Sequence, residues 1–392
     1  MNTAFLWGAA TSAHQVEGGN IHNDWWAWEK QRPVTFRSGR ACEHYERYGE
    51  DFALARQLGH NAHRLSLEWS RIELRPGVYN SRALAHYRQV LLTLKRESLT
   101  SFVTLHHFTN PLWFAQAGGW ADASAAALFS QYVERVVQEL GDLVDYWVTI
   151  NEPHVYATMS YWHKRWPPHE HSWQRVLTVI DHMAAAHIQA YHVIHRYLPR
   201  ARVGMAHSVI GYFPARPTSR ADRFVVAVLN WGSKQRWYAL TRGAHDYLGI
   251  NYYFSVTKRA AWRWPFMYNQ PWSGATSDLG WPIRPEGLTH ILKALQSYNL
   301  PIYITENGVA DTTDSQRPDF IRSHLRAIEQ AQAVGVDVRG YLHWSLLDNF
   351  EWADGFTPRF GLVAVDYQTQ QRLPRPSAYA YKAIIEQSLR RH

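Results

Sequence analysis

Cysteine is almost absent from this sequence. Cys42 is the only cysteine among 392 residues, so the chain cannot form an internal disulfide. A single thiol gives no sign of adaptation to an oxidising compartment. Because isolated cysteines are most often small buried apolar residues, we do not expect Cys42 to act as a nucleophile.

Long hydrophobic runs are also missing. Arg, His or Gly interrupts the apolar stretches well before the roughly 20 residues that a transmembrane helix needs. The first residues, Met1 to Gly8, contain neither a charged leader nor a long apolar segment, so we expect no secretory signal. The sequence therefore predicts a cytoplasmic protein with no membrane partner.

Charged residues are few, and aromatic residues are many. Only 19% of residues are charged, which argues against disorder. The net charge is +8, but the basic residues are scattered and form no run longer than Arg390-Arg391, so we predict no nucleic-acid partner. The 19 Trp, 22 Tyr and 15 Phe exceed what a core needs, and flat rings of this kind suit the apolar faces of sugars.

We expect a single domain over residues 1–392, because the sequence has no Gly/Ser linker, charge block or low-complexity segment. This length exceeds the usual domain, but α/β barrels with insertions reach roughly 400 residues. Eight short apolar or β-branched runs are the expected strands: Phe5–Ala10, Asn61–Leu67, Thr100–His106, Tyr146–Ile150, Arg202–Ala206, Tyr247–Ile250, Pro301–Thr305 and Arg339–Trp344. The amphipathic stretches between them include Tyr45–Leu58, Ser81–Glu97, Ala123–Leu140, Arg175–Tyr197 and Pro318–Ala333.

This alternation of strands and helices favours a parallel α/β sheet, and closing eight strands produces a (β/α)8 TIM barrel. An open, doubly wound sheet is the rival architecture. That sheet would need a glycine-rich phosphate loop after the first strand, and neither Gly8 nor the pair Gly18-Gly19 supplies that pattern. We therefore predict the barrel.

Two glutamates follow strand-like runs that lie 154 residues apart: Glu152 in Thr149–Pro153 and Glu306 in Ile304–Gly308. Either one alone could be a solvated residue at a strand end. Hydrolysis of a glycosidic bond, however, needs one carboxyl to protonate the leaving oxygen and another to attack or stabilise the sugar carbon. Active sites of barrels lie at the C-terminal ends of the strands, and polar or aromatic residues occur there on six predicted strands: Arg64 with Glu68, His106-His107, Asn151 with Glu152, Asn251 to Tyr253, Glu306, and Trp344.

These motifs make the chain resemble glycoside hydrolase family 1, the retaining β-glucosidases and β-glycosidases. The resemblance covers nearly the whole chain, and its motifs occur in order at barrel spacing: Phe5–Thr11, Gln15–Gly18, Thr104–His107, Thr149–Pro153, Leu248–Tyr253, Ile304–Gly308, Trp344–Trp352 and Gly361–Tyr367.

The resemblance implies a role for each matching residue. Glu152 corresponds to the general acid/base, Glu306 to the nucleophile, and Asn151 to the residue that hydrogen-bonds the sugar 2-hydroxyl. Three supporting residues are implied around them: Arg64 beneath the nucleophile, Tyr253 orienting it, and Asn251 near the acid/base. The sugar-binding residues implied are Gln15, His107 and Glu351 as hydrogen-bonding partners, Trp344 as a stacking floor and Trp352 as a wall.

The resemblance also implies a substrate. The substrate is expected to be a small-molecule β-glycoside or a short oligosaccharide. A retaining exo-enzyme would remove the terminal non-reducing residue, which is an unphosphorylated β-D-glucosyl residue or, as well, a galactosyl or fucosyl residue. Glu351 stands where phospho-sugar enzymes have a phosphate-binding region. No cofactor and no metal are expected, and the oligomeric state stays open.

Three features depart from the family pattern. Phe108 and His154 stand where the family frequently has Trp, and residues 208–246 form a shortened segment, so the aglycone preference is in doubt while the reaction is not. Alternatives to hydrolysis by an exo-enzyme are a catalytically silent carbohydrate-binding barrel, a transglycosylase and an endo-acting relative. Both glutamates are present, which argues against the silent barrel, and the Trp344–Trp352 segment argues against the endo-acting enzyme.

Overall fold

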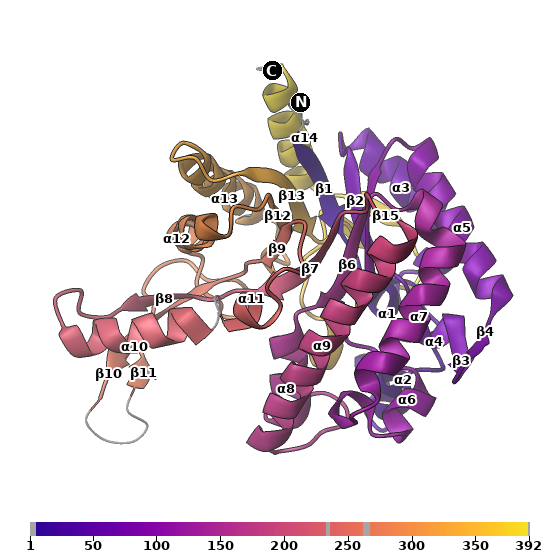
Figure 1. Ribbon diagram of the computed structural model, residues 1–392. Coiled ribbons are helices and arrows are strands. Elements are labelled where there is room, and N and C mark those ends of the chain that lie inside the picture. Colours follow the sequence, from indigo (N-terminus) through magenta and orange to yellow (C-terminus); the bar gives the residue numbers. More distant parts are fainter. Residues whose placement is uncertain (1–4, 233–235, 262–266, 391–392) are drawn as a thin grey trace.

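Eight parallel strands form a closed barrel in the computed structural model, which describes residues 5–232, 236–261 and 267–390 (Figure 1). The strand order around the barrel is β1-β13-β12-β9-β7-β6-β5-β2. The strands are β1 (Leu6–Ala10), β2 (Ala62–Ser66), β5 (Thr100–His106), β6 (Tyr146–Asn151), β7 (Val203–Ser208), β9 (Leu248–Asn251), β12 (Ile302–Asn307) and β13 (Val338–Trp344). The predicted (β/α)8 TIM barrel is confirmed, and each predicted strand agrees with an observed one to within two residues at either end.

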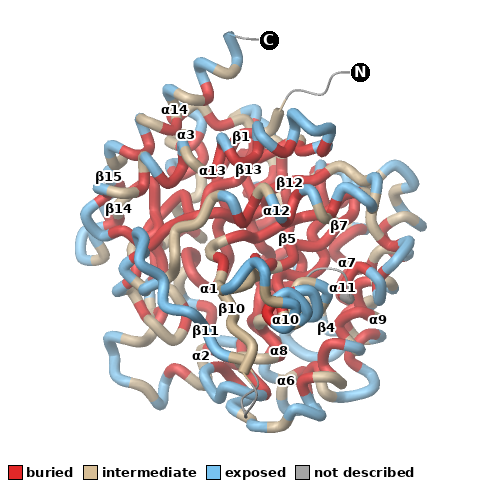
Figure 2. The backbone as a smooth tube through the Cα atoms, turned by 90° about the vertical axis from the view of Figure 1, so that its left-hand side faces the viewer, coloured by how far each residue is buried: buried red, intermediate tan, exposed pale blue. Residues whose placement is uncertain are grey.

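The barrel strands are buried on both faces, because helices cover the outside and side chains fill the inside. Every residue of β2, β6, β9 and β12 is buried. Figure 2 shows this burial as a red centre surrounded by paler helices and loops. Strands of this kind appear in the sequence as short continuous apolar runs, which explains why they could be recognised without alternation of polar residues.

The surrounding helices bury one face each. They include α3 (His44–Gln57), α5 (Ser81–Arg96), α7 (Ala125–Leu140), α9 (Trp173–Tyr197), α12 (Pro285–Leu295), α13 (Arg317–Gln332) and α14 (Pro376–Leu389). In α5, Leu84, Leu91 and Leu94 face the barrel, and the Asn80 side chain caps the first turn by accepting from the Arg82 and Ala83 N–H groups. Five of these helices match the predicted amphipathic stretches.

The N-terminal end of the barrel interior is closed by aromatic side chains. Phe102, Tyr146, Tyr247 and Tyr303 come from different strands or strand ends and form one buried cluster. The Tyr146 and Tyr303 hydroxyls lie 3.0 Å apart and share a hydrogen bond. This plug fills the lower half of the barrel interior.

A small substructure projects from the barrel after β7. It consists of β8 (Gly211–Pro214), α10 (Arg220–Asn230), β10 (Ser255–Ala260) and β11 (Met267–Asn269), with strand order β11-β10-β8 (Figure 1). The segment expected to be shortened, residues 208–246, therefore includes a folded strand and helix in its described part. Across the described residues, no helix has both the length and the apolar character needed to cross a membrane. The single-domain expectation remains a prediction.

Candidate active site

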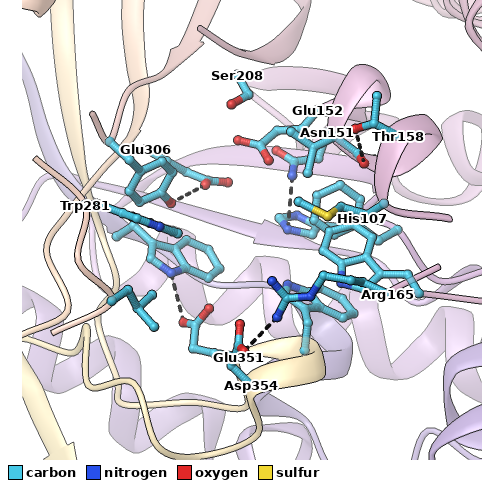
Figure 3. Close-up of a pocket in the computed structure, with 18 of the residues that line it drawn as sticks. His107, Asn151, Glu152, Thr158, Arg165, Ser208, Trp281, Glu306, Glu351 and Asp354 are labelled. Atoms are coloured by element: carbon cyan, nitrogen blue, oxygen red, sulfur yellow. Dashed lines mark hydrogen bonds and ion pairs between the residues drawn. The ribbon is translucent and has the colours of Figure 1, made fainter. Parts of the chain in front are cut away.

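A cavity of about 430 Å³ opens at the C-terminal end of the barrel (Figure 3). Nine of the eleven residues expected in the site line it: Gln15, His107, Asn151, Glu152, Tyr253, Glu306, Trp344, Glu351 and Trp352. The remaining two, Arg64 and Asn251, lie beneath its surface and contact the lining residues from below. The strand ends thus bring together residues that lie hundreds of positions apart in the chain.

Glu306, near the end of β12, is held by two donors. Arg64 Nη1 donates to Glu306 Oε1 at 2.6 Å, and the Tyr253 hydroxyl donates to Glu306 Oε2 at 2.6 Å. Arg64 lies on β2 and is completely buried, so its charge acts in a medium of low dielectric constant. Both oxygens of Glu306 therefore have a partner that favours the carboxylate form.

Glu152 has a different environment. It follows β6 and forms the N-cap of α8 (Pro153–Tyr161), with a left-handed backbone at φ 44°. Such a conformation is costly for a residue with a Cβ, and it occurs most often at functional sites. The Asn251 side-chain amide donates to Glu152 Oε1 at 2.8 Å, and the Ser208 hydroxyl also hydrogen-bonds this carboxyl. No cation contacts Glu152 directly in the described part of the chain.

Asn151 connects the two carboxyls to the sugar-binding residues. Its Oδ1 accepts from Arg64 Nη2 at 2.6 Å and from Asn251 Nδ2 at 3.1 Å. Two donors on Oδ1 fix the amide orientation, so Nδ2 faces His107 Nε2 at 3.2 Å and donates to it. Burial holds the pKa of His107 well below its usual range, and the neutral ring therefore carries its proton on Nδ1.

The two glutamates differ in electrostatics. Burial, followed by the nearby charge of Glu306, raises the pKa of Glu152 to about 8. Burial raises the pKa of Glu306 too, but Arg64 and Tyr253 oppose that rise. The environment therefore favours Glu306 as the ionised member of the pair and Glu152 as the protonated one, which is the division of roles that acid-assisted displacement at a sugar carbon needs.

Glu351, Trp344 and Trp352 line another part of the cavity wall. Trp344 Nε1 donates to Glu351 Oε1 at 3.1 Å. Burial raises the pKa of Glu351 to about 8, so this carboxyl is largely protonated at neutral pH. The ring of Trp352 is parallel to His107, with 6.1 Å between centroids and 13° between planes.

Gln15 lines the cavity, but its amide is already occupied. Nε2 donates to Asn349 Oδ1 at 2.9 Å and to the Phe350 carbonyl at 2.8 Å, while Oε1 accepts from the Ser12 hydroxyl at 2.6 Å. Only a remaining lone pair on Oε1 is available for a sugar hydroxyl in this arrangement. The other expected sugar partners keep more free hydrogen-bonding capacity.

The two substituted aromatic positions take different places. Phe108 lines the cavity and packs edge-on against Trp352 at 5.2 Å, so it supports the wall without an indole N–H. His154 lies outside the lining and packs 5.2 Å from the ring of Trp237. Of the two positions expected to alter the aglycone region, only Phe108 therefore lines the cavity, whereas His154 lies outside it.

Several lining residues were not anticipated. Trp166, Trp281 and Phe360 supply further aromatic walls, and Arg165, Asp354 and Ser208 supply polar atoms. Ser208 is the last residue of β7 and Asp354 lies in a short 3-10 helix, whereas the other four lie in loops, and none belongs to one of the motifs named above. Val155, Thr158 and Met159 also line the cavity. They could have been predicted, because their spacing places them on one face of α8, the helix that Glu152 caps. The expectation that the site needs no metal remains a prediction.

Known proteins are similar to this chain in sequence and in fold. The model of Glycosyl hydrolase family 1 matches residues 1–241 and 235–389. A 1,4-beta-D-glucan glucohydrolase of Thermotoga neapolitana is 30% identical, with 97% of each chain covered, and a beta-galactosidase of Sulfolobus acidocaldarius is 31% identical over 97% of this chain and 94% of its own. The structure of a beta-glycosidase from Pyrococcus horikoshii superposes with a TM-score of 0.91 at 38% identity, covering 97% of this chain and 93% of that one.

Proposed function

We propose, from the fact that this chain belongs to glycosyl hydrolase family 1, that it is a retaining exo-β-glycosidase of unphosphorylated substrates. Its preferred residues are terminal non-reducing β-D-glucosyl groups, with galactosyl and fucosyl groups accepted. The relatives named beta-glucosidase and beta-galactosidase support the glucosyl and galactosyl part of this range. The observation that carries the proposal is the pair of buried carboxyls: Arg64 and Tyr253 hold Glu306, whereas no cation among the described residues contacts Glu152 directly.

The reaction proceeds in two displacements. Glu306 attacks the anomeric carbon while Glu152 donates its proton to the leaving oxygen, which leaves a covalent glycosyl-enzyme and a free aglycone. Glu152, now ionised, removes a proton from water, and that water releases the sugar from Glu306. The net result is hydrolysis with retained configuration, and the enzyme returns to its starting protonation state.

The contacts of Asn251 favour retention over inversion. Its side-chain amide donates to Glu152 Oε1 at 2.8 Å, and Asn251 itself lies beside Glu306 in the register of β9 and β12. Carboxyls separated by one such side chain lie close together, as the roughly 5–5.5 Å separation of a retaining pair requires. An inverting pair needs roughly 6.5–9.5 Å to hold a water molecule between carboxyl and sugar.

The remaining lining residues support a single bound sugar at the base of the cavity. Asn151 and His107 face one side of the ring, and Trp344, Glu351 and Trp352 face the other. A 6-phosphate would place negative charge beside Glu351, where burial and the charges of Glu306 and Asp354 already disfavour any further negative charge. The neutral 4- and 6-hydroxyls can exchange hydrogen bonds with Glu351 in either orientation of the 4-hydroxyl.

The test is turnover of nitrophenyl β-glycosides by the wild type and by Glu306→Gln. We expect the wild type to cleave the β-glucoside with the β-anomer of glucose as first product, observed by NMR. Glu306→Gln should be folded by circular dichroism but inactive. An α-anomer as first product would refute retention, and near-wild-type turnover in Glu306→Gln would remove Glu306 from the mechanism.

A further inference from the structure

Helix α8 leads outward from the catalytic acid. It begins directly after Glu152 and ends at Tyr161. Val155, Thr158 and Met159 line the cavity at helical spacing, so one face of α8 follows the cavity from its base. Trp162 is the next position on this face, and its N–H still donates to the Thr158 carbonyl at 3.0 Å. At 1.5 Å per residue, Trp162 lies about 15 Å beyond Glu152 along the helix direction.

Trp162 and Trp173 form an exposed aromatic pair at this outer end. Their side chains are 37% and 52% exposed, and the ring centroids lie 5.7 Å apart at an angle of 78°. His171 stacks on Trp162 at 4.3 Å, and its ring nitrogen Nδ1 donates to the Trp162 carbonyl at 2.6 Å. The orientation of the Trp162 ring is thus held by the protein while part of its surface stays in water, an unusual arrangement for two adjacent indoles.

The loop that bears this pair is fixed against the cavity mouth. His163, Arg165 and Trp166 follow Trp162 and line the cavity. Arg165 forms an ion pair with Asp354 at 2.8 Å, and this contact connects the loop to the short helix η6 (Trp352–Asp354). Figure 3 shows Arg165 and Asp354 close together beside the wall that contains Glu351. The outer tryptophans therefore have a defined position relative to the sugar-binding residues.

We infer that Trp162 and Trp173 bind the sugar units of the aglycone, and that the enzyme prefers β-linked oligosaccharides to glycosides with a small aglycone. The inference rests on the proposed function, because Glu152 protonates the leaving oxygen and the leaving group therefore lies on the side where α8 begins. A chain of sugars extending along α8 reaches the exposed indoles after a few units. Pyranose rings have apolar faces that can cover an indole, whereas their hydroxyl edges remain in water.

The experiment measures kcat/KM for oligosaccharides of increasing length in the cello and laminari series. For each variant we compare kcat/KM for the pentasaccharide with kcat/KM for the disaccharide, measured on one preparation. The ratio of these two values does not depend on the fraction of folded enzyme in the sample. Tyr379→Ala is the matched control, because Tyr379 is 57% exposed and lies on α14, at the end of the molecule where the chain termini lie, away from α8 (Figure 1).

We expect the ratio to fall about tenfold in Trp162→Ala, as for removal of one interface tryptophan, and to fall further in the double variant with Trp173→Ala. Tyr379→Ala should keep the wild-type ratio. Equal ratios in Trp162→Ala and Tyr379→Ala for both series would overturn the inference. If the wild type cleaves no glycoside, the proposed function fails instead. In that case, calorimetry of cellopentaose binding tests whether Trp162 and Trp173 bind sugar units. Equal affinity in the wild type and in Trp162→Ala would refute the inference.

Discussion

Tyr253→Phe tests how the protein keeps its nucleophile ionised. The Tyr253 hydroxyl donates to Glu306 Oε2 at 2.6 Å inside a buried site, and Arg64 contacts the other oxygen. Phenylalanine keeps the ring, which packs 5.7 Å from Trp281, and removes only the donor. The carboxylate of Glu306 loses one charge-assisted hydrogen bond, while its protonated form loses much less.

The size of the effect follows from that single contact. A hydrogen bond to a charged group contributes roughly 1.5–3 kcal/mol, which corresponds to a decrease in kcat/KM of roughly 10- to 150-fold if the bond is kept up to the transition state. Because the ionised form is destabilised, the pKa of Glu306 rises in the variant. The acidic limb of the pH profile should therefore move to higher pH, since activity needs Glu306 without its proton.

The assay is kcat/KM for a nitrophenyl β-glucoside across the pH range. Tyr252→Phe is a matched control, because its hydroxyl is buried but contacts Ser255 and the Arg284 carbonyl and does not touch Glu306. That variant should lose stability and keep its acidic limb. If Tyr253→Phe has the same acidic limb as Tyr252→Phe, the hydrogen bond does not support the charge on Glu306 and the reasoning is wrong.

Three further outcomes are expected. Glu152→Ala should lose the alkaline limb that a pKa of about 8 produces, and azide should restore turnover of substrates with good leaving groups; an unchanged limb without rescue would exclude Glu152 as the acid. Glu351→Ala should lower kcat/KM, because each lost hydrogen bond to the neutral carboxyl costs roughly 0.5–1.5 kcal/mol of transition-state binding, and the wild type should prefer a nitrophenyl β-glucoside to its 6-phosphate; the reverse preference would refute the substrate class. Burial lowers the pKa of His60 to about 3, and its ring nitrogens have no hydrogen-bond partner among the described residues. Because only the unfolded chain takes up this proton between about pH 6.5 and pH 3, His60 should contribute about 1.4 kcal/mol per pH unit to the loss of stability in that window, and His60→Leu should reduce the slope by that amount in urea unfolding.

The architecture and the family could both be predicted from the sequence alone. Apolar runs alternating with amphipathic helices predicted every barrel strand, because strands covered on both faces need continuous apolar residues. Glu152 and Glu306 could be placed at strand ends by the same local pattern, and the motifs around them indicated the family. These properties are local, so no three-dimensional information was needed.

The hydrogen-bonding capacity that each polar group keeps for a substrate could not be predicted from the sequence, because it depends on the tertiary structure. The amide of Gln15 is occupied by Ser12, Asn349 and Phe350, a fact that depends on segments more than 330 residues apart in the chain. Burial raises the pKa of Glu351 to about 8 and so favours its protonated form, although a glutamate in the sequence would be expected to be a carboxylate. The role inferred for Trp162 likewise depends on its place at the end of α8 beside Trp173. Hydrogen-bond capacity and dielectric environment arise only when segments that are remote in the sequence pack together.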